Sequence, residues 1–356
     1  MEHAMDRRAF LKGAAGAAAV AGAGVTAVGA SPAEAKPATI RALATRRFGK
    51  GGPTLPILGY GGAGLPKKWG NPLSTEDRVA LVRRAYDAGI RYFDTSISYS
   101  YRESQAIIGK ALKDVRDKVF ITTKVDFWDK SQPDGRITKV DKADVGRQVE
   151  KNLAELQSDY IDAILIHGTP GVEQMTVEQC MEVQGELVKA RDKGRVRFVG
   201  FSAHSYFHKA LALIESGGFD LCMLSYGYIP RGHNQVFSAR MTELRNACVA
   251  RAHERGMGIA AMKVIGGGVL GAWAPHLVPG FDKKRLAGLP GAAIRWVLQD
   301  ERIHLLVIGM RLPRELNANL RTLAGDTTYT LQDRALLATF SARAYDSDAV
   351  KKMRVD

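Results

Sequence analysis

The stretch Ala163-Ile164-Leu165-Ile166-His167 is an uninterrupted apolar run that ends in an ionisable residue. A second run, Leu305-Leu306-Val307-Ile308, has the same apolar character. Strands of a parallel sheet that are buried on both faces read as near-continuous apolar runs, whereas half-exposed strands alternate apolar and polar residues. These two stretches therefore predict strands of a parallel sheet whose faces are both covered.

Working outward from these runs, short apolar segments alternate with longer amphipathic ones. The predicted strands are Ile57–Gly61, Ile90–Thr95, Val119–Lys124, Tyr160–His167, Val196–Ser202, Asp220–Ser225, Gly258–Met262 and Leu305–Gly309. The predicted helices are Ser74–Gly89, Ser104–Leu112, Asp144–Leu156, Val177–Lys193, Ser205–Ser216, Thr242–Arg255, Leu289–Asp300 and Arg314–Ala324. Eight strands, each followed by a helix, predict an α/β fold of the (β/α)8 TIM-barrel class. The alternative is an open doubly wound sheet, but the first strand lacks a G-x-G-x-x-G that enters a helix, which normally opens such a sheet.

Residues 46–340 are assigned to the barrel and residues 341–356 to a C-terminal tail. Before the first barrel strand, Arg46–Leu58 predicts a hairpin that turns at four residues, Gly49-Lys50-Gly51-Gly52, and plugs the N-terminal mouth of the barrel. Long loops follow strands three, six and seven. Loops in these positions lie on the catalytic face of a barrel, so we expect them to shape a substrate pocket.

Residues 1–35 have the pattern of a secretory leader. Arg7-Arg8 lies in a charged start, Gly13–Ala30 is apolar, and Ala33-Glu34-Ala35 suits signal peptidase. The paired arginines indicate the twin-arginine pathway, with its export machinery as a partner and a periplasmic or secreted product. The alternative is a membrane anchor, but the apolar stretch is short and rich in glycine and alanine. We expect no stable membrane span in the mature chain.

The formal net charge is +14 and the sequence pI is about 9.7, which raises nucleic acid as a partner. The basic residues are, however, scattered among acidic ones along amphipathic helices, without a basic block, so no nucleic-acid partner is predicted. Cys180, Cys222 and Cys248 lie in apolar patterns without C-x-x-C spacing, which predicts buried packing residues. No metal-binding signature is present.

Four ionisable residues fall at or near the ends of neighbouring predicted strands. Asp94, Lys124 and His167 close strands two, three and four, and Tyr99 follows Asp94 by five residues. Each alone has a structural explanation, but together they suit carbonyl reduction. A tyrosine can protonate the oxyanion, a lysine beside it lowers its pKa, and an aspartate holds the lysine. A neutral histidine can orient the carbonyl oxygen.

Five ordered segments resemble motifs of the aldo-keto reductase family. They are residues 89–99 (GIRYFDTSISY), 104–112 (SQAIIGKAL), 121–124 (ITTK), 159–167 (DYIDAILIH) and 194–202 (GRVRFVGFS). The resemblance covers nearly all of Arg46–Ala324. It implies NAD(P)H-dependent reduction of a small aldehyde or ketone, with Tyr99 as general acid. Lys124 and Asp94 would tune Tyr99, and His167 would position the carbonyl.

The resemblance also implies a dinucleotide extended across the barrel mouth, NADP(H) in preference to NAD(H), and no metal. The residues that it assigns to cofactor binding are Ser202, Met223, Met262, Lys263, Gly309, Arg311, Arg314 and Asn319. Helix-terminal amides beside arginines suit a polyanion. Several positions depart from the family pattern. Ala203 lies where the family usually has asparagine or arginine, and Met223 lies where glutamine is common. Glu315 lies where an arginine for the 2′-phosphate is common.

Two other functions remain open. Lys124 could form a Schiff base in a lyase or aldolase. A lysine nucleophile must be neutral, which requires a desolvated amine or cationic neighbours. An ion pair with Asp94 would instead stabilise the charged form of Lys124. The chain could instead be a redox sensor or regulatory protein that binds the cofactor and turns over little.

Overall fold

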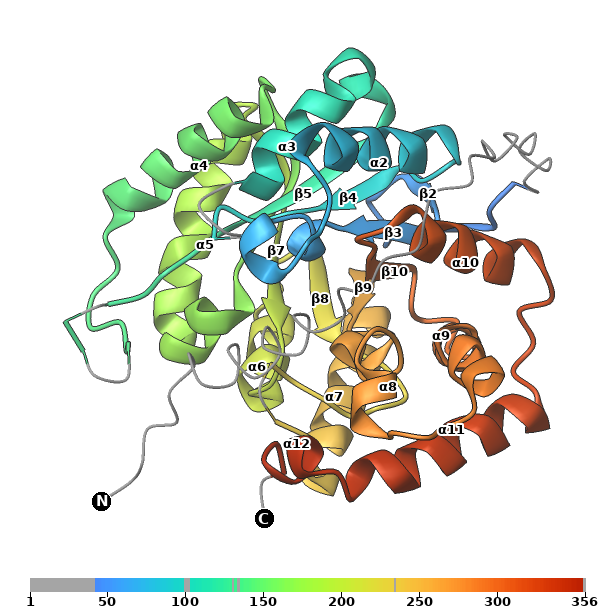
Figure 1. The fold of residues 1–356 in the computed structure, drawn as a ribbon. Helices are drawn as coiled ribbons and strands as arrows, with labels where there is room; N and C mark the ends of the chain where they lie inside the picture. The colour runs from blue at the N-terminus through green and yellow to red at the C-terminus, as the bar shows by residue number, and fades with distance from the viewer. Residues whose placement is uncertain (1–41, 99–102, 130, 133–134, 234, 355–356) are drawn as a thin grey trace. The chain divides into compact units, whose positions relative to one another are not determined.

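The computed structural model of the protein describes residues 42–98, 103–129, 131–132, 135–233 and 235–354. Eight strands close into a barrel in the order β10-β3-β4-β5-β6-β7-β8-β9, and every neighbouring pair is parallel. The barrel strands are β3 (Leu58–Gly61), β4 (Tyr92–Asp94), β5 (Phe120–Val125), β6 (Ile161–Ile166), β7 (Val196–Ala203), β8 (Leu221–Ser225), β9 (Gly258–Met262) and β10 (Leu305–Gly309). The predicted TIM barrel is confirmed (Figure 1).

Helices surround the barrel in chain order. They are α2 (Thr75–Asp87), α3 (Glu103–Leu112), α4 (Lys142–Leu156), α5 (Val177–Asp192), α6 (Phe207–Ser216), α7 (Ala239–Glu254), α8 (Ala274–Leu277), α9 (Lys283–Leu298), α10 (Pro313–Ala324), α11 (Leu331–Tyr345) and α12 (Asp348–Lys351). Short 3-10 or π turns lie at η2 (Gly62–Gly64), η3 (Lys67–Trp69), η4 (Lys113–Lys118), η5 (Gly168–Val172) and η6 (Gly266–Gly268). Side-chain caps define several helix starts. Ser74 Oγ accepts from Asp77 N, and Thr176 forms a capping box with Gln179.

Helices α7 and α9 begin three or more residues before their predicted starts. Ser238 caps α7 by accepting a hydrogen bond from the Met241 amide. The helix therefore begins at Ala239, three residues before its predicted start at Thr242. Asp282 caps α9 through the Arg285 amide, so α9 includes a turn that was assigned to a loop. Pro290 lies inside α9 rather than at its start.

The N-terminal hairpin pairs β1 (Thr45–Arg47) with β2 (Thr54–Pro56) in antiparallel register. Phe48, in its turn, packs edge-on against Tyr92 and Phe120 inside the barrel, with ring centroids 5.8 and 5.9 Å away. The Lys50 amide donates to the Gly256 carbonyl, which joins the turn to the residues before β9. The predicted hairpin is therefore present and packs against the aromatic residues at this end of the barrel.

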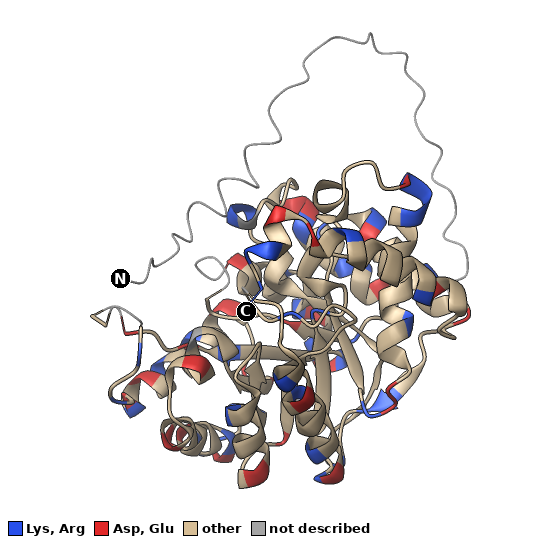
Figure 2. Ribbon diagram, turned by 90° about the horizontal axis from the view of Figure 1, so that it is seen from below, with Lys and Arg blue, Asp and Glu red and all other residues tan. Residues whose placement is uncertain are grey.

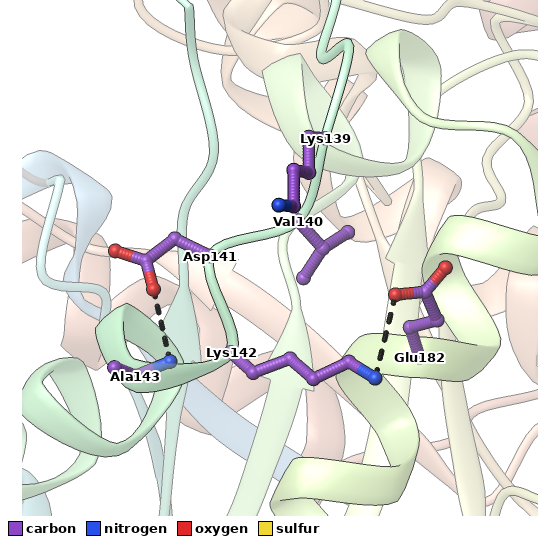
Figure 3. Close-up of a pocket in the computed structure, with 6 residues that line it drawn as sticks. All are labelled: Lys139, Val140, Asp141, Lys142, Ala143 and Glu182. Carbon is purple, nitrogen blue, oxygen red and sulfur yellow. Dashed lines mark hydrogen bonds and ion pairs between the residues drawn. The ribbon is translucent and has the colours of Figure 1, made fainter.

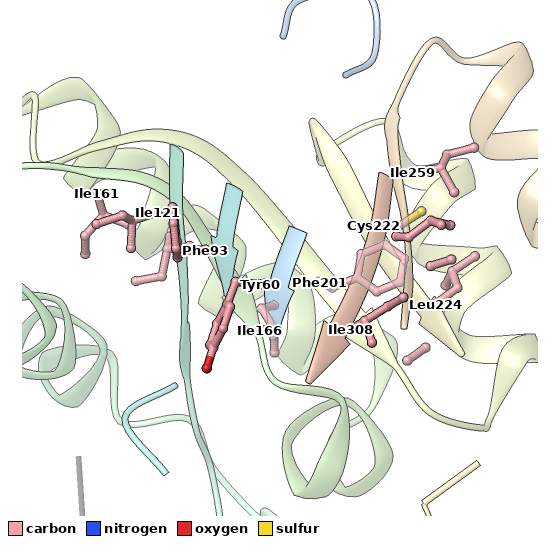
Figure 4. Packing of buried hydrophobic residues seen from close by; sticks show 14 of the residues in the cluster. Tyr60, Phe93, Ile121, Ile161, Ile166, Phe201, Cys222, Leu224, Ile259 and Ile308 are labelled. Atoms are coloured by element: carbon pink, nitrogen blue, oxygen red, sulfur yellow. The ribbon is translucent and has the colours of Figure 1, made fainter. Parts of the chain in front are cut away.

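The main core fills the space between the strands and the surrounding helices. Figure 4 shows side chains of this cluster, among them Phe93, Ile121 and Ile166, which come from neighbouring strands. Cys180, Cys222 and Cys248 are buried and free, as the sequence predicted. A second cluster joins α8, α9 and the C-terminal helices.

Strand β5 divides its side chains between two environments. Lys124 takes part in the ion pair described below, whereas its neighbour Thr123 contacts the helix layer. Thr123 Oγ1 donates to Gln105 of α3 and lies 3.3 Å from Asn152 Oδ1 of α4. Asn152 Nδ2 in turn donates to the main-chain carbonyl of Lys124 at 3.1 Å. This buried polar network ties the backbone of β5 to two helices.

The predicted leader, residues 1–35, and Tyr99 lie outside the described residues. Within the ranges that the structure describes, no helix has the length and apolar character needed to cross a membrane. Lys and Arg residues are interspersed with Asp and Glu over the helices (Figure 2).

Candidate active site

Three of the four predicted catalytic residues lie together at the C-terminal end of the barrel strands. Asp94 is the last residue of β4, Lys124 is the fifth of the six residues of β5, and His167 directly follows β6. Their exposed fractions are 3%, 1% and 6%. Lys124 Nζ donates to Asp94 Oδ1 at 2.6 Å and to the Thr95 carbonyl oxygen at 2.7 Å. The structure contains the Lys124–Asp94 ion pair that the sequence predicted, and it is buried.

Burial and charge act in opposite directions on this pair. Burial raises the pKa of Asp94, and the Lys124 ammonium opposes that change. Burial likewise lowers the pKa of Lys124, and the Asp94 carboxylate opposes it. Each charged form therefore depends on the other, and removing one partner leaves the second charge without its compensation.

His167 is held through its backbone and through one ring nitrogen. Its amide donates to the Val125 carbonyl at 3.0 Å. Its Nδ1 lies 3.3 Å from Ser98 Oγ and 3.5 Å from Asp126 Oδ1. The sequence analysis did not identify Ser98 or Asp126. Asp126 lies two residues after Lys124, and alternate residues of a strand point to the same face. Extending the pattern of β5 by one residue could therefore have predicted Asp126 on the same side as Lys124.

The residues predicted around the nicotinamide lie on adjacent strands. Ser202 of β7 is in register with Met223 of β8, and Ser225 of β8 is in register with Met262 of β9. Ser202 Oγ accepts a hydrogen bond from the Gly168 amide at 2.8 Å, so this hydroxyl also holds the backbone just after His167. Met223 and Met262 pack in the same apolar cluster as Tyr92.

The residues predicted around the diphosphate and adenosine lie between β10 and α10. Gly309 ends β10 beside Gly61 and is exposed, and a Cβ on it would lie 3.6 Å from the Gly61 carbonyl oxygen. Arg311 is partly buried and Arg314 is exposed, so two cations are available to a polyanion at this position. Asn319 of α10 is buried.

Glu315 already occupies the backbone amides at the start of α10. Its Oε2 accepts from Arg311 N at 2.6 Å and from Leu312 N at 3.3 Å. The amides of Arg311 and Leu312 are therefore not free to bind a polyanion, contrary to the expectation for this helix start. The exposed glycine and the two arginines still fit a dinucleotide, and the arginine side chains rather than the amides would hold its phosphates.

A comparison with protein families matches residues 57–330 to the aldo/keto reductase family. The chain belongs to the aldo/keto reductase family. The aldo-keto reductase YhdN of Bacillus subtilis is 32% identical over 142 residues, covering 38% of this chain and 40% of that protein. L-galactose dehydrogenase of Arabidopsis thaliana is 30% identical over 161 residues, covering 44% and 47%. The matched stretch therefore spans less than half the length of these curated relatives.

Solved structures support the fold of this aldo/keto reductase chain. The holo form of aldo-keto reductase AKR11C1 from Bacillus halodurans superposes with a TM-score of 0.63 at 18% identity, covering 84% of this chain and 96% of that one. A thermostable aldo-keto reductase in complex with epalrestat gives 0.61 at 20% identity, covering 84% and 100%. Likeness at this identity establishes the barrel architecture.

Further ionisable residues, which the sequence did not identify, lie near His167 of this aldo/keto reductase chain. The ring of His204, after β7, is 6.2 Å from that of His167 and 5.7 Å from that of His233. Burial lowers the pKa of His204 well below its usual value, and the charge of Lys263 lowers it further, so His204 is neutral at physiological pH. Glu173 accepts a hydrogen bond from Ser205 Oγ at 2.9 Å, and burial raises its pKa.

An open surface hollow of about 590 Å³ lies between the start of α4 and the face of α5 (Figure 3). Lys142 Nζ lies 3.8 Å from Glu182 Oε2, and Asp141 Oδ1 accepts from the Ala143 amide. These polar groups are engaged with one another, and the lining contains none of the predicted site residues. Among the residues that the structure describes, no cluster of His, Cys, Asp and Glu is arranged to hold a metal ion.

Proposed function

We propose that this aldo/keto reductase chain reduces a small aldehyde or ketone to an alcohol with NAD(P)H. The observation that carries the proposal is the buried Lys124–Asp94 ion pair, with Nζ 2.6 Å from Oδ1, on the same barrel rim as His167. Family membership over residues 57–330 supports the same chemistry. One relative at 28% identity, from Schizosaccharomyces pombe, is named as an NADP(+) aldo-keto reductase.

In this mechanism the bound dinucleotide supplies hydride to the carbonyl carbon. Tyr99 donates its phenolic proton to the carbonyl oxygen as charge develops there. The Lys124 ammonium favours the resulting tyrosinate, and Asp94 keeps that ammonium charged and in place in spite of its burial. The role of Tyr99 is part of the proposal and rests on its position five residues after Asp94.

His167 positions the carbonyl oxygen in the proposed reaction. Ser98 can donate its hydroxyl hydrogen to Nδ1, 3.3 Å away, which leaves the ring hydrogen on Nε2. Nε2–H can then donate to the substrate oxygen without carrying a full charge. The backbone hydrogen bond from His167 to Val125 keeps the residue at the end of β6.

The ion pair also argues against the Schiff-base alternative. A lysine nucleophile must be neutral, and Asp94 at 2.6 Å stabilises the charged form of Lys124. The sensor alternative is supported by Met223 and Ala203, which offer no side-chain hydrogen bond to a nicotinamide. Tight dinucleotide binding with negligible turnover of every carbonyl tested would favour the sensor.

We propose NADP(H) in preference to NAD(H). The Arg311 and Arg314 guanidinium groups supply positive charge for a 2′-phosphate, whereas the Glu315 carboxylate beside them opposes it. Dissociation constants for NADPH and NADH, measured by quenching of tryptophan fluorescence, test the preference. A tighter complex with NADH would contradict it.

Steady-state consumption of NADPH with a panel of aldehydes and ketones tests the proposed function. Tyr99→Phe should reduce kcat by a factor of about 100 or more while the dinucleotide dissociation constant stays unchanged. Arg240→Gln, at an exposed position on α7, is the matched control. A Tyr99→Phe variant with wild-type kcat would refute the assigned proton donor.

We also propose that residues 1–35 direct export by the twin-arginine machinery, and that the protein carries dinucleotide loaded before translocation. Replacing Arg7 and Arg8 by lysine should retain the protein in the cytoplasm. Protein recovered from the periplasm should contain bound dinucleotide, measured after denaturation by absorbance and enzymatic cycling. Periplasmic protein that is empty and still active would contradict cofactor loading.

A further inference from the structure

His304 lies at the N-terminal end of the barrel, directly before β10, and is partly buried. Two hydrogen bonds join it to Ile259 of the neighbouring strand β9. Its backbone amide donates to the Ile259 carbonyl oxygen at 3.0 Å, and its ring Nδ1 accepts from the Ile259 amide at 3.0 Å. An accepting Nδ1 carries no hydrogen, so the ring is the neutral tautomer with its hydrogen on Nε2.

The same ring supports the N-terminal hairpin. Phe48, in the turn between β1 and β2, lies edge-on to the His304 ring, with ring centroids 6.3 Å apart. Arg46 of β1 donates from Nη1 to the carbonyl oxygen of Ile303, which precedes His304 in the chain. One side of the hairpin is therefore attached to the segment that carries His304.

The turn of the hairpin also rests on the residues that begin β9. The Lys50 amide donates to the Gly256 carbonyl oxygen at 2.7 Å. A Cβ on Gly49 would lie 2.5 Å from the amide nitrogen of Gly258, the first residue of β9, so the two backbones are in direct contact. A displacement of this end of β9 would therefore displace the hairpin as well.

The groups that act on the His304 ring disfavour its protonation. Burial lowers the pKa of His304, and the charges of His253 of α7 and Arg46 of β1 lower it further. The His253 ring is stacked on that of His304, with centroids 6.4 Å apart. The carboxylates of Asp300 and Glu301 act on Arg46 and favour its charged form. An imidazolium at His304 would therefore be repelled by Arg46 and, once protonated, by His253.

We propose that His304 is a pH-sensitive latch that holds the N-terminal hairpin on the barrel and releases it in acid. Protonation puts a hydrogen on Nδ1, which can then no longer accept from the buried Ile259 amide. The pKa of His304 is lower in the folded chain than the ordinary value of about 6.5, so the stability from this hydrogen bond is complete above about pH 6.5 and is lost as the pH falls below it.

The latch lies at the opposite end of the barrel from Lys124 and His167, which follow the C-terminal ends of the strands. It therefore does not depend on the proposed function, and its test requires no substrate or cofactor.

Hydrogen–deuterium exchange of the full chain, measured by mass spectrometry of its peptides, tests the latch in the wild type. Between about pH 7.5 and about pH 5, amide protection in residues 45–56 and at the start of β9, corrected for the intrinsic exchange rate, should fall at least about tenfold, as expected for loss of a buried hydrogen bond. Peptides from α4 should keep their protection. No loss in the hairpin, or an equal loss in α4, overturns the proposal.

Two variants identify the titrating group. His304→Asn keeps an acceptor near the position of Nδ1 and cannot be protonated in this range, so its hairpin should lose less than about twofold of its protection. His253→Asn removes the stacked neighbour and is the matched control, whose hairpin should still lose protection in acid. Circular dichroism at neutral pH confirms that each variant is folded. A His304→Asn variant that still releases the hairpin, or a His253→Asn variant that no longer does, overturns the proposal.

Discussion

Replacing Asp94 by asparagine preserves the size of the side chain and removes the carboxylate that lies 2.6 Å from Lys124 Nζ. Both side chains are almost fully buried, with exposed fractions of 4% and 2%, so solvent screens neither charge. Removal of one partner from a buried ion pair destabilises a protein by about 3–5 kcal/mol. The Thr95 carbonyl, 2.7 Å from Nζ, remains as an acceptor, so we expect the lower end, about 3 kcal/mol.

Urea unfolding at a series of pH values measures this loss. In D94N, burial lowers the pKa of Lys124 without the opposing charge of Asp94. The folded state then binds fewer protons than the unfolded state below the ordinary lysine pKa, so the free energy of unfolding rises with pH. The deficit of D94N relative to wild type should therefore shrink as the pH rises toward the ordinary lysine pKa of about 10.4.

The double variant D94N/K124M separates an uncompensated charge from a packing defect. If the stranded ammonium causes the loss, removal of that charge by Lys124→Met should make the double variant more stable at pH 7 than D94N alone. A D94N loss below about 1 kcal/mol, or a double variant no more stable than D94N, would refute this reasoning.

Two further changes have defined expectations. Glu315→Gln removes a carboxylate beside Arg311 and Arg314. The ratio of NADPH affinity to NADH affinity, measured by fluorescence titration, should therefore rise several-fold. An unchanged ratio would mean that the 2′-phosphate binds elsewhere. Gly109→Ala puts a Cβ 2.6 Å from the Leu156 carbonyl oxygen, where α3 meets α4. This clash should lower the free energy of unfolding, measured in urea, by about 1–3 kcal/mol. An unchanged free energy of unfolding would mean that the two helices can move apart at no cost.

The barrel could be predicted because its strands are buried on both faces and their apolar runs are unbroken. Ala163–Ile166 and Leu305–Ile308 read as strands without any knowledge of their neighbours. Helix starts were harder to place. The start of α9 was missed because Asp282 lies in a stretch that resembles a loop, and because Pro290 is normally a helix breaker.

Site residues on strands could be predicted, whereas those on loops could not. Asp94, Lys124 and His167 follow from the rule that barrel chemistry lies at the C-terminal strand ends. Glu173 accepts a hydrogen bond from Ser205 Oγ, more than thirty residues away in sequence, and no local pattern indicates such a contact. Glu315 was recognised as a departure from the family, but its hydrogen bonds to the amides of α10 depend on the geometry of that turn.

The alternation of side chains along β5 has a consequence for insertions and deletions. Thr123 belongs to the network with Gln105 and Asn152, and the next residue, Lys124, belongs to the ion pair. A gain or loss of a single residue within β5 would exchange these two environments, placing the ammonium among the helices and the hydroxyl against Asp94. Changes of chain length should therefore be tolerated after Val125, in the loop that leads to α4, and be strongly selected against inside the strand itself.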